Sequence, residues 1–204
     1  MKGFANLEQH IANVKAHGVP VVVAVNAFID DPVAELEWVR DKSREVGAAD
    51  AAVSTHWADG GKGAEALATA VVKATAKPSV FRHLYDIEWP IKRKIQTIAT
   101  QIYGASAVSF DAQAEQDIEI AQQLGFDRLP ICMAKTPLSL SHDPALKGRP
   151  SGFTLPIKEV RILAGAGFLT TVCSGIQLMP GLPKKPAGER IGIDSGTGEI
   201  VGLS

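Results

Sequence analysis

The sequence predicts an α/β fold, in which part of a doubly wound parallel sheet is followed by a smaller α+β C-terminal domain. Two observations predict it. In the first 76 residues, amphipathic stretches alternate with short β-branched runs, the order typical of parallel strands joined by crossover helices. After Pro78 this alternation stops, and a long Pro- and Gly-rich loop is expected over residues 135–156. We therefore expect two domains, residues 1–78 and residues 79–204.

The first domain is expected to open with a helix that ends before Gly18. Apolar residues at steps of three and four form its inner face, namely Phe4, Leu7, Ile11 and Val14. The β-branched run over residues 19–25 then predicts a strand that is covered on both faces.

A second helix is expected to run to about Val46, with Asp31 as its N-terminal cap and Gly47 after its end. Its inner face is expected to carry Val33, Leu36 and Val39. A strand over residues 51–54 follows, and a third helix is expected to bury Ala64, Leu67, Ala68, Val71 and Val72. One or two early parallel strands are few for an independent doubly wound sheet, so we expect the chain to begin inside a larger domain.

In the second domain, isoleucines at helical spacing predict a helix over residues 91–102. A strand over residues 107–110, a helix capped by Asp111 and a buried strand over residues 129–134 are expected next. The following loop, residues 135–156, is expected to be functional or to pack as a unit of its own. The last expected element is a hairpin around the glycines of residues 196–198.

Composition excludes several classes of protein. A net charge of −1 gives no broad basic surface for nucleic acid. The longest apolar run is far shorter than the roughly 20 residues that span a bilayer. Cys132 and Cys173 lie among apolar residues and are interpreted as buried free thiols. The histidines have no metal-ligand spacing, and we expect a cytoplasmic protein without membrane or nucleic-acid partners.

One short basic cluster, Lys92 to Lys94, has two interpretations: the solvated face of a helix, or an anion-binding patch.

The two loops that follow the first strands are the candidate site, because ligands of open α/β sheets bind outside the carboxyl ends of the strands. The first loop runs from Asn26 to Asp31, and the second from Ser54 to Gly63. An amide, a carboxylate and a Gly-rich turn in such loops are similar to the base-recognition loops of P-loop nucleotide-binding proteins. Phe28 and Trp57 could clamp a flat heterocycle there, or could be core residues at strand–helix junctions.

No segment of the chain matches the phosphate-binding pattern G-x-x-x-x-G-K-[ST]. Lys62, within the second loop, is not followed by serine or threonine. A phosphate-binding loop is therefore absent from these residues.

Several longer segments resemble the formate–tetrahydrofolate ligases. They are residues 6–14 (NLEQHIANV), 18–28 (GVPVVVAVNAF), 57–63 (WADGGKG), 129–136 (LPICMAKT), 165–168 (GAGF), 179–183 (MPGLP) and 200–203 (IVGL). They follow one another along essentially the whole chain. The chain is thus identified as resembling the C-terminal portion of such a ligase, without the half that holds the P-loop.

The resemblance implies an ATP-dependent reaction that converts formate and tetrahydrofolate to 10-formyltetrahydrofolate, ADP and phosphate. ATP and tetrahydrofolate would be substrates, and Mg²⁺ and a monovalent cation would be bound by residues outside this chain. Phe28 and Trp57 fall where the family sandwiches folate. The other residues expected around that pocket are Asn26, Val53, Ser54, Gly60 and Gly61.

Two roles remain open for the chain. It could contribute the folate-binding wall of a ligase, as a homo-oligomer or as the complement of an N-terminal P-loop segment. Alternatively, it could be a catalytically inactive module that binds folate or assembles with ligase subunits.

Overall fold

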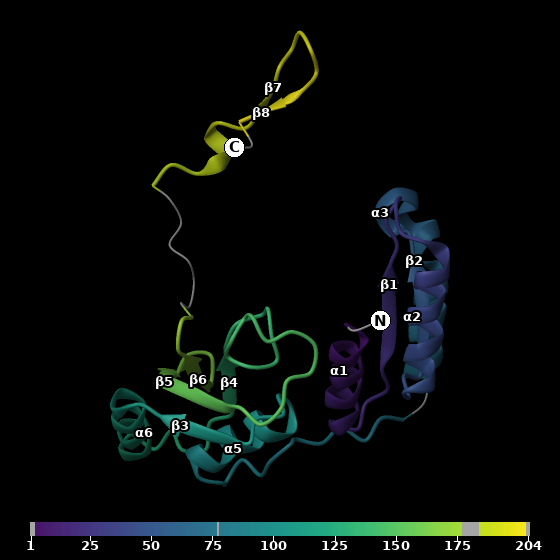
Figure 1. Ribbon diagram of the computed structural model, residues 1–204. Helices are drawn as coiled ribbons and strands as arrows, with labels where there is room; N and C mark the ends of the chain where they lie inside the picture. The colour runs from purple at the N-terminus through teal and green to yellow at the C-terminus, as the bar shows by residue number, and fades with distance from the viewer. Residues whose placement is uncertain (1–2, 77, 177–183, 203–204) are drawn as a thin grey trace.

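The computed structural model describes residues 3–76, 78–176 and 184–202, and these residues form a mixed α/β protein (Figure 1). We call residues 3–76 the N-terminal lobe, residues 78–176 the C-terminal lobe and residues 184–202 the terminal hairpin. Each contains its own small sheet. The α/β class expected from the sequence is confirmed.

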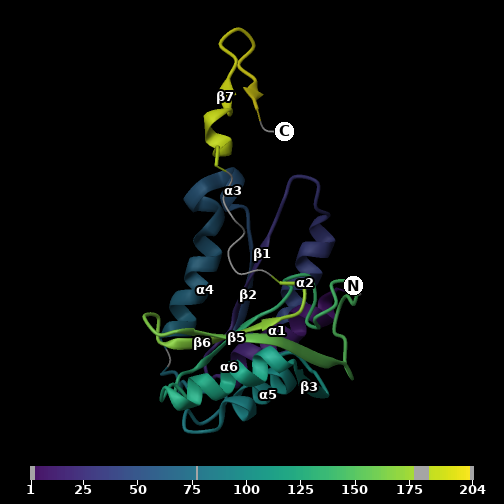
Figure 2. The ribbon, with the colours of Figure 1, turned by 90° about the vertical axis from the view of Figure 1, so that its left-hand side faces the viewer.

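The N-terminal lobe is built on two parallel strands, β1 (Val22–Asn26) and β2 (Asp50–Ser54). Helix α1 (Phe4–Ala16) precedes β1, and α2 (Val33–Glu45) connects the two strands. Helix α4 (Glu65–Thr75) follows β2, after a loop that contains the short helices α3 (His56–Asp59) and η1 (Gly60–Ala64). Helices α2 and α4 lie on opposite sides of the strand pair (Figure 2).

The core of this lobe lies between the strands and the helices α1 and α2. It contains Ile11, Val21, Val23, Val25, Ala48 and Ala51, with Leu7, Leu36 and Val39 packed against them. Strand β1 starts at Val22 rather than at residue 19, and Ala24 on its other face is exposed. The second face of β1 is therefore less covered than the sequence predicted.

Several side chains that were expected to point inward do not. Val33 is 69% exposed, and Val71 and Val72 of α4 are also exposed. Only one of the two faces of each helix meets the narrow two-stranded sheet, so apolar residues beyond that contact stay in solvent. Asp31 does not cap α2: its carboxylate accepts a hydrogen bond from the backbone N–H of Phe28, and Pro32 occupies the cap position.

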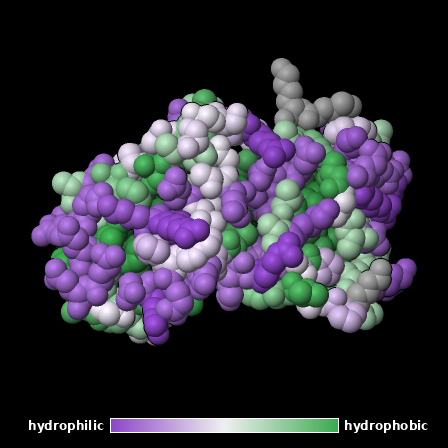
Figure 3. Space-filling model, turned by 90° about the horizontal axis from the view of Figure 1, so that it is seen from below, coloured by the Kyte–Doolittle hydropathy of each residue, from purple (hydrophilic) through white to green (hydrophobic). Residues whose placement is uncertain are grey.

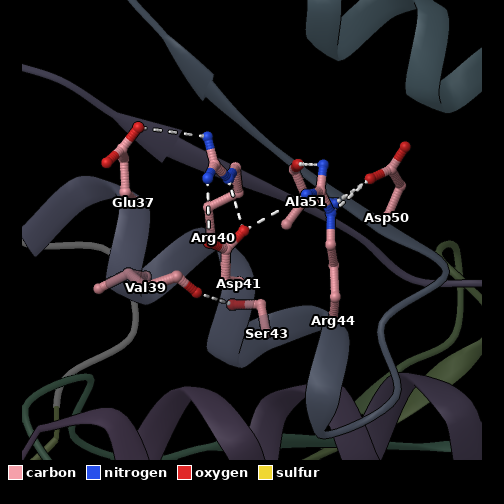
Figure 4. A network of polar contacts seen from close by, with 8 residues as sticks. All are labelled: Glu37, Val39, Arg40, Asp41, Ser43, Arg44, Asp50 and Ala51. Atoms are coloured by element: carbon pink, nitrogen blue, oxygen red, sulfur yellow. Dashed lines mark hydrogen bonds and ion pairs between the residues drawn. The ribbon is translucent and has the colours of Figure 1, made fainter. Parts of the chain in front are cut away.

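One ion pair, between Arg44 and Asp50, joins the outer face of α2 to the start of β2 (Figure 4). Arg44 donates to the Asp50 carboxylate at 2.9 Å and to the backbone carbonyl of Ala51 at 2.8 Å. The backbone N–H of Ala51 and the Arg44 guanidinium lower the pKa of Asp50. Because these groups are partly exposed, we expect the network to fix the orientation of α2 but to contribute little to the free energy of unfolding.

The C-terminal lobe contains a four-stranded mixed sheet in the order β3-β5-β6-β4. Its strands are β3 (Ala107–Phe110), β4 (Ile131–Ala134), β5 (Thr154–Leu163) and β6 (Phe168–Cys173). β5 and β6 are antiparallel, whereas β3 and β4 run parallel to their neighbours. The apolar face of this sheet packs against α5 (Ile91–Gln101) and α6 (Ala112–Gln123), where Ile91, Ile95 and Leu155 are fully buried.

Lys94 corrects the interpretation of the basic cluster. Its side chain is fully buried, and its ammonium group donates to the backbone carbonyls of Asp127 and Leu129, at 2.5 and 2.7 Å, and of Ile87 at 3.3 Å. Lys92 and Arg93 are exposed and contact Glu115 and the Trp89 ring. Only two of the three cations therefore lie on a solvated face.

The two cysteines differ as well. Cys173 is buried and free, as expected, but Cys132 is free and exposed. The alternation of side chains along β4 explains this, because Ile131 and Met133 face the core and Cys132 faces away from it.

The loop between β4 and β5 covers residues 135–153 and packs as a unit, with Thr136, Ser139, Leu140 and Ser141 buried. Hydrogen bonds between its own serines and carbonyls hold it together: Ser139 and Ser141 contact each other at 2.9 Å, and Ser141 donates to Asp143. This outcome is one of the two that were expected for the loop.

Helix α1 contacts both lobes. Its apolar side faces the first core, while the buried amides of Gln9 and Asn13 face the end of α5. Asn13 donates to the carbonyl of Ile102 at 3.0 Å, and Asn6 donates to the carbonyl of Gly148 at 3.1 Å. Hydrogen bonds from polar side chains on one face of α1 therefore join the two lobes.

The terminal hairpin pairs β7 (Gly192–Ile193) with β8 (Ile200–Val201) and lies apart from both lobes (Figures 1 and 2). A short helix, η2 (Ala187–Glu189), precedes it. The segment at residues 179–183 and the residue Leu203, which the family resemblance included, lie outside the described residues.

No helix among the described residues is both long enough and apolar enough to cross a membrane. Seen from below, hydrophilic and hydrophobic residues are interspersed over the surface of the molecule (Figure 3).

Candidate functional site

The candidate site lies where β1 and β2 end side by side. Asn26 and Ser54, the last residues of the two strands, are paired in the parallel register. One residue further, the backbone N–H of Ala27 donates to the carbonyl of Ser54 at 2.9 Å. The two loops that the sequence singled out therefore leave the sheet together at one edge.

Phe28 and Trp57 meet at this edge. Their ring centroids lie 5.8 Å apart, with the ring planes tilted by 34°. Phe28 is 59% and Trp57 is 55% exposed, so neither ring is part of a core. The indole N–H of Trp57 donates to the carbonyl of Ala27 at 3.0 Å, which ties the second loop to the first.

The loop after β2 is held in shape by hydrogen bonds within itself. The hydroxyl of Ser54 contacts the ring of His56 at 3.1 Å and donates to the carbonyl of Gly63 at 3.2 Å. The backbone N–H of Thr55 donates to the same carbonyl at 3.1 Å, and its hydroxyl donates to Asp59 at 2.6 Å. These contacts position the helical turn that carries Trp57.

The remaining predicted site residues lie in different environments. Asn26, Gly60 and Gly61 are exposed. Ser54 is fully buried in its hydrogen bonds, and Val53 packs against the core beneath α1 and α2. The structure thus brings Phe28 and Trp57 together, whereas the Val53 and Ser54 side chains are engaged inside the lobe.

Gly63 is a residue that sequence reasoning grouped with its neighbours without distinguishing it. A Cβ atom there would lie 2.5 Å from the carbonyl carbon of Thr55 and 2.7 Å from the backbone nitrogen of His56. At Gly61 an added Cβ would meet nothing within 4 Å. The close approach that only glycine permits is therefore at Gly63, and nothing in the run of repeated glycines indicates which of them it is.

Comparison with known proteins places the chain in a family. The sequence profile described as formate–tetrahydrofolate ligase matches residues 1–204, that is, the whole chain. The chain belongs to the formate–tetrahydrofolate ligase family. Among its relatives, cytoplasmic C-1-tetrahydrofolate synthase of Homo sapiens is 50% identical over 202 residues, which are 99% of this chain and 22% of that protein.

Two further relatives carry the same printed name. The protein of Mus musculus is 50% identical over 202 residues, and that of Schizosaccharomyces pombe is 47% identical over 204 residues. The chain spans 22% of the length of each of these relatives. It therefore corresponds to a portion of a formate–tetrahydrofolate ligase relative rather than to its full length.

Within the described part of this ligase-family chain, no three His, Cys, Asp or Glu side chains lie close enough together to hold a metal ion. The four main cavities of the described residues also lie away from the ring pair of Phe28 and Trp57. What this edge offers to a ligand is two exposed aromatic faces beside an exposed amide.

Proposed function

We propose that this chain contributes the folate-binding wall of a formate–tetrahydrofolate ligase, with Phe28 and Trp57 holding the flat ring system of tetrahydrofolate. The observation that carries the proposal is the exposed ring pair at the carboxyl edge of two parallel strands. Exposed large aromatic side chains that contact each other are favourable stacking surfaces for a heterocycle. Asn26, Gly60 and Gly61 would border the ligand, and Val53 and Ser54 would support the loops from within.

The ring pair must open for a sandwich to form. A flat ring between two others needs a separation of about 7 Å, twice the usual contact distance of carbon atoms. The centroids are 5.8 Å apart, so the rings now contact each other. Trp57 is fixed by its hydrogen bond to Ala27, and Phe28 is the more exposed ring. We expect Phe28 to turn aside as the ligand enters.

Titration with tetrahydrofolate tests this role. Replacing either ring by alanine removes one stacking surface, so Phe28→Ala and Trp57→Ala are expected to weaken binding by about tenfold or more. Isothermal titration calorimetry measures the affinity. Phe81→Ala is the matched control, because Phe81 is as exposed as Phe28 but lies away from this edge. Binding that is unchanged in both ring variants would contradict the proposal.

The finer fold assignment is part of the same proposal. We place β1 and β2 in a larger P-loop NTPase-like parallel sheet, and divide the chain into residues 1–78, which belong to that domain, and residues 79–204. The incompletely covered face of β1 supports this, as does its edge opposite β2, which pairs with no strand among the described residues, because parallel strands are normally covered on both faces. Further strands would come from a segment outside this chain or from another subunit.

ATP-dependent activation of formate is assigned to that other segment. The 204 residues contain no phosphate-binding loop pattern, and the described residues offer no metal cluster for Mg²⁺ or a monovalent cation. We therefore derive no step of phosphate or metal chemistry from this chain. With ATP, formate and tetrahydrofolate, the chain alone is expected to form no 10-formyltetrahydrofolate; its appearance would overturn this division of roles.

The second candidate function is an inactive module that binds folate or assembles with ligase subunits in the cytoplasm. The incompletely covered face of β1 favours assembly, either with itself or with a P-loop segment. Analytical ultracentrifugation with and without the remaining ligase polypeptide separates the two forms of assembly. Recovery of formyl transfer in the mixture would favour the ligase role, and assembly without activity would favour the module.

A further inference from the structure

Three cavities meet at Tyr103, at the junction of the two lobes. Their volumes are about 440, 430 and 330 Å³, and Tyr103 lines all three. The two larger ones also share His10 and Met133, so they form one continuous groove along α1. We call these three joined cavities the inter-lobe groove.

The lining of the inter-lobe groove combines three cationic side chains with three imidazoles. The cations are Lys135, Lys147 and Arg149, the imidazoles are those of His10, His17 and His83, and among the described residues no aspartate or glutamate lines any of the three cavities. The nearest acidic partner that the structure gives to this set is Glu8, 3.9 Å from Arg149. In a chain with a net charge of −1, this separation of charge is not a consequence of overall composition. Basic side chains around a partly enclosed space concentrate positive potential there.

Lys135 and Tyr103 form the middle of the groove. The Lys135 ammonium lies 4.8 Å from the centre of the Tyr103 ring and donates to the carbonyls of Thr136 and Ser139. Burial lowers the pKa of Lys135 and raises the pKa of Tyr103, so the phenol remains a neutral donor. Its hydroxyl forms no hydrogen bond with any residue that the structure describes. The Tyr103 hydroxyl and the Lys135 amino group thus supply hydrogen-bond donors to the same space.

We propose that the inter-lobe groove binds a small polyanion, a molecule with two or more carboxylate or phosphate groups spaced along α1. Lys135 and Lys147 line one of the two larger cavities and His17 and His83 line the other, so a single compact anion would contact only some of these residues. An extended anion would place one group near Lys135 and Lys147 and another near His17 and His83. Charge-assisted hydrogen bonds of this kind are shorter and stronger than those between neutral groups.

This site is separate from the ring pair of Phe28 and Trp57, and it does not rest on the proposed folate role. None of its lining residues belongs to the two loops at the carboxyl edge of β1 and β2. A failure of tetrahydrofolate binding would therefore leave this proposal standing, and the reverse also holds.

Calorimetric titration of the full chain with two simple extended probes, tripolyphosphate and tricarballylate, tests the proposal. The uncharged trimethyl ester of tricarballylate is the control ligand. At least one of the two anions is expected to bind with one-to-one stoichiometry, and the ester is not. Binding of only one of them would identify phosphate or carboxylate as the preferred group.

Variants of the groove locate the binding. Lys147→Gln removes an exposed charge, and Tyr103→Phe removes only the hydroxyl; each is expected to weaken the anion about tenfold. Lys158→Gln, at an exposed lysine of β5 outside the groove, is the matched control and is expected to bind as the original chain does. Urea unfolding of each variant checks that it is folded.

Three outcomes would overturn the proposal: neither anion binds, the ester binds as well as the acid, or all three variants bind alike. The last of these would indicate attraction to the overall charge of the surface rather than a site.

Discussion

Lys94 is the residue whose environment departs most from its sequence context. Its buried ammonium group joins the start of α5 to the segment before β4 through three carbonyls. Lys94→Met preserves the length of the side chain but leaves these carbonyls without a donor. Because a buried unpaired polar group is destabilising, we expect the free energy of unfolding to fall by about 2–4 kcal/mol in urea titrations.

The neighbouring lysine is the control. Lys92 is exposed and pairs with Glu115 at the surface, so Lys92→Met is expected to change the free energy of unfolding by less than about 1 kcal/mol. Equal effects of the two substitutions would show that the carbonyl contacts of Lys94 contribute nothing beyond those of a surface cation.

Cys173 is expected to make the free energy of unfolding depend on pH in the alkaline range. Burial raises the pKa of this thiol from 9.0 to about 11. Between these values the unfolded chain loses the thiol proton while the folded chain keeps it. Its contribution to stability is therefore complete below pH 9 and is lost as the pH rises through about 11. Cys173→Ala should remove this part of the alkaline decline, by at most about 3 kcal/mol.

Urea unfolding at pH 8 and pH 10.5 measures this difference. Cys132→Ala, at the exposed thiol, is the matched control and is expected to decline as the original chain does. An alkaline decline that persists unchanged in Cys173→Ala would contradict the assignment.

At the scale of elements, the loop between β2 and α4 depends on Gly63. Gly63→Ala would force Thr55 and His56 to move, because the added methyl group overlaps their backbone atoms. We expect a loss of about 1–3 kcal/mol in stability. The emission of Trp57, whose position follows from this loop, should also change. Gly61→Ala, where the added methyl meets nothing, should stay within about 0.5 kcal/mol. A loop that accepts both substitutions equally would disprove this account.

Most elements were predictable because their patterns are local. The isoleucines of α5 repeat at helical spacing, and the run before Asn26 is β-branched, so both elements appear within a few residues of their expected bounds. The exposure of Val33 and Val72 was not predictable. Periodicity in the sequence shows which residues share one face of a helix, but not whether another element covers that face. A two-stranded sheet is too narrow to cover the apolar faces of both flanking helices.

The candidate site likewise contains features that were predictable from local patterns and features that were not. That Phe28 and Trp57 lie near each other follows from two strands ending at one edge, which alternation in the sequence indicates. The burial of Ser54 depends on the fold of the second loop back onto the strand, and the core position of Val53 depends on the packing of α1 and α2 against it. The Ser54 contact joins a side-chain hydroxyl to a backbone carbonyl nine residues away, and such a contact leaves no pattern in side-chain types.

At the scale of the whole molecule, the terminal hairpin stands apart from the packing that stabilises the lobes. Every side chain from Lys184 to Val201 is exposed, including Ile193 and Ile200. Because it buries little apolar area, removing residues 184–204 should change the free energy of unfolding by less than about 1 kcal/mol. Urea unfolding of the shortened chain measures this. A loss of several kcal/mol would mean that the hairpin packs against the lobes in solution.

The placement of α1 limits how this polypeptide can be divided into fragments. A piece that started at residue 79 would keep the carbonyl of Ile102 but lose the amide of Asn13 that binds it. The complementary piece would expose Gln9 and Asn13 on α1. The other side of α1, which carries Ile11, would still pack in the core of the N-terminal lobe. When the two pieces are mixed, they would therefore have a specific surface on which to recombine. Amide side chains, rather than apolar ones, would form that surface.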